Sequence, residues 1–163
     1  MNVFVCDVDP VIAAQSLADK HVVKMVVETA QMLSAACELS GITFEGQYRL
    51  THRHHPCVQA LLEQNTYVRW TVLHGLALCS EYTRRYDRRH KSQNIIETAA
   101  SLLPWDTTAD FDFEQFPRAV FDEFKGLNVV EAYRRHLAHT YNVLWKPGNA
   151  RWRVPAVRPV WAT

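Results

Sequence analysis

The sequence predicts a mainly α-helical protein: a single compact domain over residues 1–163, with five or six helices, a short extended segment at the N-terminus and an extended Trp- and Pro-rich tail at the C-terminus. The chain has 163 residues, about the length of one domain. Hydrophobic residues make up 48% and charged residues 21%, which is typical of a globular protein and excludes a disordered chain. Apolar residues recur at spacings of three, four and seven, the pattern of amphipathic helices.

The first elements are an extended segment and a long helical region. Residues 2–6 form a short apolar run that we expect to be a strand or an extended arm. Asp9 and Pro10 are a good helix start, because Asp caps a helix and Pro suits its first turn. The helical pattern then continues over residues 11–40, with an expected break near residues 17–19. Its expected buried face is formed by Val22, Val23, Val26, Ala30, Leu33, Cys37 and Leu39.

The rest of the chain alternates helices with loops. We expect helices over residues 56–64, 66–86, 92–103 and 129–144. Loops are expected over residues 42–55 and 104–127, and an extended tail over residues 145–163. Asn128 and Glu131 have the spacing of a capping box, which marks the start of the last helix. The loop 104–127 is rich in acids and phenylalanines, and we expect its aromatic side chains to hold it against the core.

The cysteines and the hydropathy pattern favour a cytoplasmic protein. No apolar run is long enough to cross a membrane, and the N-terminus lacks the basic lead and long apolar core of a signal peptide. The four cysteines are Cys6, Cys37, Cys57 and Cys79. They form no C-x-x-C pair and no zinc-ribbon spacing, so we expect four reduced and mostly buried thiols.

A net charge of +1 hides two basic segments and one acidic loop. The acids gather at Asp106, Asp110, Asp112, Glu114, Asp122 and Glu123. The basic segments are interleaved with aromatic residues, and their candidate DNA- or substrate-binding residues are Arg84, Arg85, Arg88, Trp145, Arg151, Trp152 and Arg153. Such segments can contact phosphates and stack on bases. The alternative is a solvated helix end and a tail fixed by intramolecular ion pairs.

A candidate chemical site lies within residues 19–40. His21, Lys24, Glu28 and Gln31 follow one another at spacings of three, four and three, which places them along one helical face. Valines and a methionine flank them, so an ionisable stripe on a mostly buried helix indicates a cleft. The alternative is a simple surface ion pair between Lys24 and Glu28.

A histidine cluster precedes the proline at residue 56. His52, His54 and His55 could together bind a metal, but the cluster lacks a spaced partner pair such as His-Glu-x-x-His. We therefore expect no metal and no cofactor. Instead, we expect this loop to cap the following helix and to line a substrate pocket.

Two sets of motifs resemble a known family. The run Leu-Ala-Asp-Lys-His at residues 17–21, with Glu28 seven residues after the histidine, resembles the Leu-Ala-Asp-Gln-His element and glutamate of phage-type pyrimidine dimer DNA glycosylases, the endonuclease V-like proteins. The opening residues 1–5, the His55-Pro56 element and the pattern at residues 79–86 resemble uncharacterised phage and bacterial relatives of that family. The resemblance covers roughly the first 90 residues.

The resemblance implies a DNA glycosylase and AP-lyase acting on a damaged or modified pyrimidine. In that family an N-terminal α-amine attacks the sugar C1′ to form an imine, and a glutamate stabilises the ring-opened cationic sugar and assists proton transfer. Carried over, Glu28 takes the carboxylate role, His21 supports the site and Met1 supplies the amine, since Asn2 is too bulky for efficient removal of Met1. Lys24 has no counterpart in the family and is an alternative amine. The implied partner is double-stranded DNA or a pyrimidine nucleotide, in a bacterial cell or a phage-infected host.

Two other functions stay open at the level of the sequence. One is a related enzyme that uses the same pocket on modified bases or nucleotides without imine chemistry. The other is a non-enzymatic phage accessory protein that binds nucleic acid or a nucleotide. The substrate base and the oligomeric state do not follow from the sequence.

Overall fold

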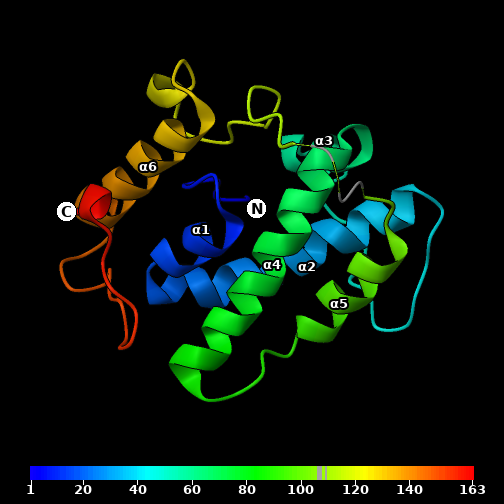
Figure 1. The fold of residues 1–163 in the computed structure, drawn as a ribbon, viewed down its shortest axis with the longest axis horizontal. Helices are drawn as coiled ribbons and strands as arrows, with labels where there is room; N and C mark the ends of the chain where they lie inside the picture. Colours follow the sequence, from blue (N-terminus) through cyan, green and yellow to red (C-terminus); the bar gives the residue numbers. More distant parts are fainter. Residues whose placement is uncertain (106–107, 109) are drawn as a thin grey trace.

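A computed structural model of the chain describes residues 1–105, 108 and 110–163, so Asp106 of the acidic loop lies outside the described residues. The predicted mainly α-helical fold is confirmed, and no strand occurs in the described ranges (Figure 1). The α-helices are α1 (Pro10–Ser16), α2 (Asp19–Leu39), α3 (Pro56–Glu63), α4 (Asn65–Tyr86), α5 (Gln93–Leu102) and α6 (Val129–His139).

Local capping chemistry explains where several helices begin. The Asp9 side chain accepts hydrogen bonds from the backbone N–H groups of Val11, at 2.7 Å, and Ile12, so α1 starts where the sequence predicts. Leu17 and Ala18 are extended and separate α1 from α2, which confirms the predicted break. Asn128 accepts a hydrogen bond from the backbone of Glu131 at 3.0 Å, as expected for the cap of α6.

The last helix differs from the prediction in its final turn. The α-helix ends at His139, and the chain continues as a π-helical turn over Thr140–Leu144. The hydroxyl of Thr140 donates to the backbone carbonyl of His136 at 2.8 Å, a local contact that competes with regular α-helical bonding. The widened turn closes with a hydrogen bond from the Trp145 N–H to the Thr140 carbonyl at 2.9 Å.

The long helices α2 and α4 form the centre of the core. Helix α2 packs against α3, α4 and α5, and α1 packs against α4 (Figure 1). The two long helices approach closely at Gly75, where an added Cβ would lie only 2.7 Å from a side-chain carbon of Thr29. Glycine is therefore needed at this position for close packing. Val23, predicted to be buried, is 37% exposed, which makes that one assignment of the α2 face wrong.

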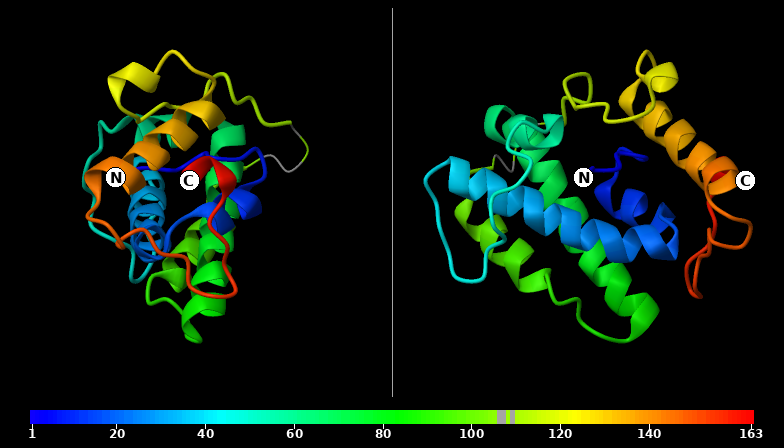
Figure 2. Two further views of the ribbon diagram at one scale, coloured as in Figure 1. Left: turned by 90° about the vertical axis from the view of Figure 1, so that its left-hand side faces the viewer. Right: turned by 180° about the vertical axis from the view of Figure 1, so that it is seen from behind.

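The N-terminal segment is an extended arm rather than a strand. Its apolar residues Val3, Phe4 and Val5 are buried between the helices α1–α5 on one side and α6 on the other (Figures 1 and 2). Helix α6 binds this arm directly, because the Arg134 guanidinium donates to the carbonyl of Cys6 and to the Asp7 carboxylate, both at 2.8 Å. Helices surround the arm, so it has no strand to pair with.

Two further expectations concern the cysteines and the absence of a membrane-spanning segment. All four cysteines are free and buried, as predicted. No helix in the described part of the chain has the length and apolar character needed to cross a membrane. After the π-helical turn, residues 145–163 form an irregular tail that ends in a short 3₁₀ turn over Val160–Ala162.

Candidate active site

The carboxylate of Glu28, in the middle of α2, gathers groups from two parts of the chain. The Met1 α-ammonium nitrogen lies 3.6 Å from Oε1 of Glu28, and the backbone N–H of Asn2 donates to Oε2 at 2.9 Å. The Lys24 ammonium lies 3.0 Å from Oε1. Glu28 is 8% exposed, whereas the Lys24 side chain is 63% exposed. The carboxylate therefore stands between the α-amine of the half-buried Met1 and a lysine at the solvent side.

The side chain of Asn2 fixes the end of the arm. Its Nδ2 donates to the carbonyl of Ala119 at 2.8 Å, and its Oδ1 accepts from the Val3 N–H at 2.8 Å and from the Tyr133 hydroxyl at 3.0 Å. The Tyr133 hydroxyl in turn accepts from the backbone N–H of Ala119 at 3.2 Å. Glu28 binds the backbone of Asn2, and Ala119 and Tyr133 bind its side chain, so together they determine where the α-amine lies.

The start of α3 forms a further wall of the site. His55 Nδ1 accepts a hydrogen bond from the Cys57 N–H at 3.2 Å, so it caps α3 as expected. Burial lowers the pKa of His55, and the positively charged N-terminus lowers it further. Burial raises the pKa of the Cys57 thiol, which makes this cysteine a poor nucleophile. His52 and His54 are exposed. Among the described residues, no three His, Cys, Asp or Glu side chains are arranged to hold a metal ion.

Comparison with known proteins assigns this arrangement to a family. The sequence model of the pyrimidine dimer DNA glycosylases matches residues 1–94, more than half of the chain. The chain belongs to this family. No curated protein and no solved structure matches it. The matched part of the chain includes the arm, Glu28 and His55, while Ala119 and Tyr133 lie outside it. Family membership implies DNA as the substrate.

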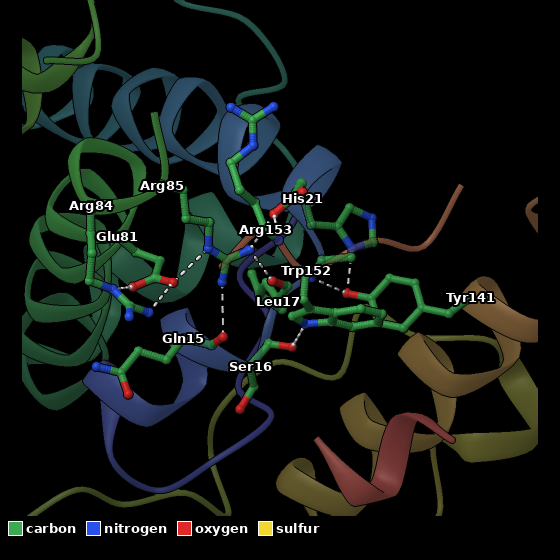
Figure 3. Close-up of polar contacts among 12 residues, drawn as sticks. Gln15, Ser16, Leu17, His21, Glu81, Arg84, Arg85, Tyr141, Trp152 and Arg153 are labelled. Carbon is green, nitrogen blue, oxygen red and sulfur yellow. Dashed lines mark hydrogen bonds and ion pairs between the residues drawn. The ribbon is translucent and has the colours of Figure 1, made fainter. Parts of the chain in front are cut away.

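His21, which we expected to support the glycosylase site, lies two helical turns from Glu28, or about 10 Å of helix rise. Its Nδ1 is 2.9 Å from the Tyr141 hydroxyl (Figure 3). The centre of its ring lies 4.8 Å from the ring centres of both Phe4 and Trp145. Burial lowers the pKa of His21 to about 3, so the ring is neutral at physiological pH. His21 therefore joins the start of α2 to the arm and the C-terminal region, and does not contact Glu28.

Arg85, which we expected to contact DNA, is buried in the interior of the protein. Its Nε donates to Glu81 at 2.6 Å, and its Nη1 donates to Asp19 at 2.9 Å and to the Leu17 carbonyl at 2.8 Å. Its Nη2 donates to the Gln15 carbonyl at 3.0 Å (Figure 3). The expectation is wrong because all three guanidinium nitrogens are used to fasten the α1–α2 junction to α4, and its side chain is not accessible to a phosphate.

The other basic and aromatic candidates divide between internal contacts and the surface. The indole N–H of Trp152 donates to the Ser16 carbonyl at 3.0 Å, and the backbone N–H of Arg153 donates to Asp19 at 3.0 Å (Figure 3). The C-terminal tail therefore packs on the α1–α2 junction, and Trp145 and Trp152 are partly buried there. The remaining candidate arginines are exposed and comprise Arg84, Arg88, Arg151 and Arg153.

Sequence reasoning missed the residues that position the amine. Asn2 and Tyr133 are 131 residues apart, and no motif or periodicity connects them. The only local signal is that Tyr133 lies on the apolar face of the last helix, which indicates burial but not a partner for its hydroxyl.

Proposed function

We propose that this protein is a DNA glycosylase and AP-lyase that acts on a damaged or modified pyrimidine, with the Met1 α-amine as nucleophile and Glu28 as proton acceptor and donor. The observation that carries the proposal is the 3.6 Å separation of the Met1 nitrogen from Glu28 Oε1. Membership of the pyrimidine dimer DNA glycosylase family supports DNA as the substrate.

In the glycosylase step the uncharged α-amine attacks C1′ of the target nucleotide. Glu28 accepts the proton that the amine must lose. The transfer is short because the Met1 nitrogen lies 3.6 Å from Oε1 of Glu28. The bond from C1′ to the base breaks, and its electron pair leaves with the base, which takes up a proton. The C1′–O4′ bond then opens as the nitrogen lone pair forms the C=N bond. O4′ keeps the electron pair of the broken bond and takes the proton from Glu28, which leaves a cationic imine on the open sugar.

In the lyase step the imine makes the C2′ protons acidic. Removal of one of them, with Glu28 as acceptor, forms a C2′–C3′ double bond while the bond from C3′ to its oxygen breaks. The electron pair of that bond leaves with the phosphate, so the strand is cut. Water then hydrolyses the imine and returns the amine. A positioned carboxylate contributes roughly 10²–10⁴-fold to proton transfers of this kind.

The structure favours Met1 over Lys24 as the nucleophile. The Met1 amine is held by the bonds of Asn2 beside a carboxylate that is largely buried, whereas the Lys24 side chain is mostly exposed. A fixed amine reaches the reactive geometry with a smaller loss of entropy than a mobile one. Lys24 instead keeps Glu28 oriented through its 3.0 Å ion pair.

The exposed arginines supply the contacts that DNA needs. Arg88, Arg151 and Arg153 are exposed around the end of α4 and the tail, whereas Arg84, also exposed, already pairs with Glu81. Such cations neutralise phosphates and release counterions on binding. The target nucleotide must leave the duplex to bring its C1′ to the amine beside the largely buried Glu28, which costs a few kcal/mol and is easier for a damaged base.

The direct test of this function is strand cleavage by the Glu28→Gln variant. We expect the wild type to cut duplex DNA that carries an abasic site or an ultraviolet lesion, and the variant to cut it roughly 10²–10⁴-fold more slowly. Glutamine keeps an acceptor for the Asn2 N–H, so the fold is retained. Glu131→Gln, a change at the exposed ion pair with Arg135, is the matched control and should cleave at the wild-type rate. Equal rates for Glu28→Gln and wild type, or no cleavage by the wild type, would overturn the proposal.

A further inference from the structure

A pocket separate from the site at Glu28 lies beside α2, at the turn that carries Val27. It has a volume of about 450 Å³ and is formed by α2, the end of α4, the loop before α3 and the segment that leads into α5. Its principal lining residues are Val27, Tyr48, Tyr82, Arg88, His90 and Lys91. The candidate active site uses none of these residues.

The pocket is strongly basic. No carboxylate lines it in the part of the chain that the structure describes. Arg88 donates through Nε to the Tyr82 hydroxyl at 2.9 Å, and its Nη groups bind no other described residue. Lys91 is exposed and forms no ion pair among the described residues. Arg89 differs from both, because Glu97 already neutralises its guanidinium. Arg88 and Lys91 are thus cations without an anionic partner.

The wall of the pocket is fixed before any ligand arrives. Asp87 ends α4 in a left-handed conformation, with φ of 52°, and so turns the chain toward the pocket. His90 Nδ1 accepts a hydrogen bond from the Ser92 N–H at 3.1 Å, and the Ser92 hydroxyl is 2.9 Å from that of Tyr48. A wall held in this way loses little conformational freedom when it binds an anion.

We propose that this pocket binds the phosphate group of a nucleotide. Arg88 and Lys91 provide the positive charge, and the partly exposed ring of Tyr48 offers a flat surface to the attached sugar or base. Tyr82 is buried against Tyr86, and its hydroxyl holds Arg88 in place. Phosphate with an aromatic neighbour is the ligand chemistry that matches this combination. The phosphate has two sources: the backbone of the DNA that enters the active site, which rests on the proposed function, or a free nucleotide, which does not.

The position of the pocket on α2 connects it with the site at Glu28. Val27 and Glu28 are adjacent in the helix, and Lys24 precedes both by one turn. The two sites therefore share one stretch of α2, on which the exposed Lys24 ammonium lies 3.0 Å from Glu28 Oε1. A DNA strand that is bound at Glu28 can extend along this stretch of α2 into the pocket.

The DNA source is tested by the salt dependence of binding to a duplex with an abasic site. The slope of log affinity against log salt is negative. We expect the double variant Arg88→Ala/Lys91→Ala to make this slope shallower by about 1, which corresponds to the loss of one phosphate contact. The control is Lys125→Ala/Arg135→Ala, which removes the same charge from exposed ion pairs elsewhere and should keep the wild-type slope.

The free-nucleotide source is tested by calorimetric titration with thymidine 5′-monophosphate. Saturable binding by the wild type that the Arg88→Ala/Lys91→Ala variant weakens at least tenfold supports the pocket, with or without an effect on DNA. An unchanged DNA slope together with unchanged or absent nucleotide binding would overturn it. If the wild type cleaves DNA while the pocket fails both tests, only the pocket proposal fails and the proposed function stands. Conversely, nucleotide binding at the pocket without any cleavage removes only the proposed function.

Discussion

Glu28 is held by donors on both of its oxygens. The Asn2 N–H binds Oε2, while the Lys24 and Met1 ammonium groups lie near Oε1. A carboxylate oriented in this way needs little rearrangement when charge develops on a substrate beside it, which is the condition for effective electrostatic and proton-transfer catalysis. The site is therefore built around the orientation of one carboxylate.

The sequence indicates part of this arrangement and not the rest. The spacing of four between Lys24 and Glu28 places them on one helical face, and the structure brings them into an ion pair. The contact of Met1 with Glu28 spans 27 residues and depends on how the arm packs. The spacing of seven between His21 and Glu28 gives the same face of the helix but two turns of separation, so it cannot produce a direct contact.

At the scale of single residues, His74 makes stability depend on pH. It is buried against Trp70, its Nδ1 donates to the Pro10 carbonyl at 3.0 Å, and burial lowers its pKa from 6.5 to about 4. The folded state binds this proton more weakly than the unfolded state. The contribution to stability is therefore complete above pH 6.5 and is lost as the pH falls toward 4.

We expect this one histidine to remove about 2 kcal/mol of unfolding free energy between pH 7.5 and pH 5. Urea unfolding at the two pH values measures the drop in unfolding free energy. In His74→Asn, which retains a donor for the Pro10 carbonyl, this drop should be smaller than in the wild type by the contribution of His74. His54→Asn, a change at an exposed histidine, should leave the loss unchanged. An identical pH dependence in His74→Asn and wild type would contradict this assignment.

At the scale of elements, the α1–α2 junction depends on a residue of α4. Asp19, the first residue of α2, and the carbonyls of Gln15 and Leu17 all bind Arg85. The Leu-Ala-Asp motif that marks the family thus has a structural explanation in this chain, because its aspartate anchors the start of the helix that carries Glu28. Basic composition alone could not separate this buried arginine from its exposed neighbours Arg84 and Arg88.

We expect Arg85→Ala to lower the unfolding free energy by about 3–5 kcal/mol, because it removes the buried guanidinium that joins Glu81 to Asp19 and leaves the carbonyls of Gln15 and Leu17 without this donor. Arg135→Ala removes an exposed pair with Glu131 and should cost less than about 1 kcal/mol. Chemical denaturation of the two variants beside the wild type measures both values. A similar, small loss in both would show that the buried network is not a stabilising anchor.

The helices themselves were largely predictable, and their irregular ends were not. Periodicity located α2 and α4, and Pro10, Pro56 and Asn128 marked three starts. The change from α- to π-helical turns occurs at Thr140, where the side chain bonds to the carbonyl of His136, and periodicity does not encode such a change. The arm is as apolar as a strand, but whether it pairs depends on its neighbours, which here are helices.

At the scale of the whole molecule, the second half of the chain completes a site that the first half begins. The family match ends at residue 94, yet Ala119 and Tyr133 hold the Asn2 side chain. Burial raises the pKa of Tyr133 well above its ordinary value, so its hydroxyl keeps its proton. Contacts over more than 100 residues of chain arise only from the complete fold, and a sequence motif cannot indicate them.

We expect Tyr133→Phe to slow the reaction at an abasic site by up to about 100-fold, because it loosens the arm and displaces the Met1 amine while leaving the ring in place. DNA affinity should stay at the wild-type value, so the loss should fall on kcat and not on KM. Single-turnover cleavage and binding titrations separate the two quantities. A variant that is only less stable in urea, with the wild-type kcat, would show that the hydroxyl does not position the amine.

The central claim is that the Met1 α-amine beside Glu28 forms the imine. Its most direct test is to incubate the protein with an abasic duplex and borohydride, which reduces an imine to a stable amine, and then to measure the intact mass and locate the modified peptide. We expect one DNA adduct per chain, on the α-amine of Met1. A protein that gains no adduct, or that carries it on Lys24, would contradict the account.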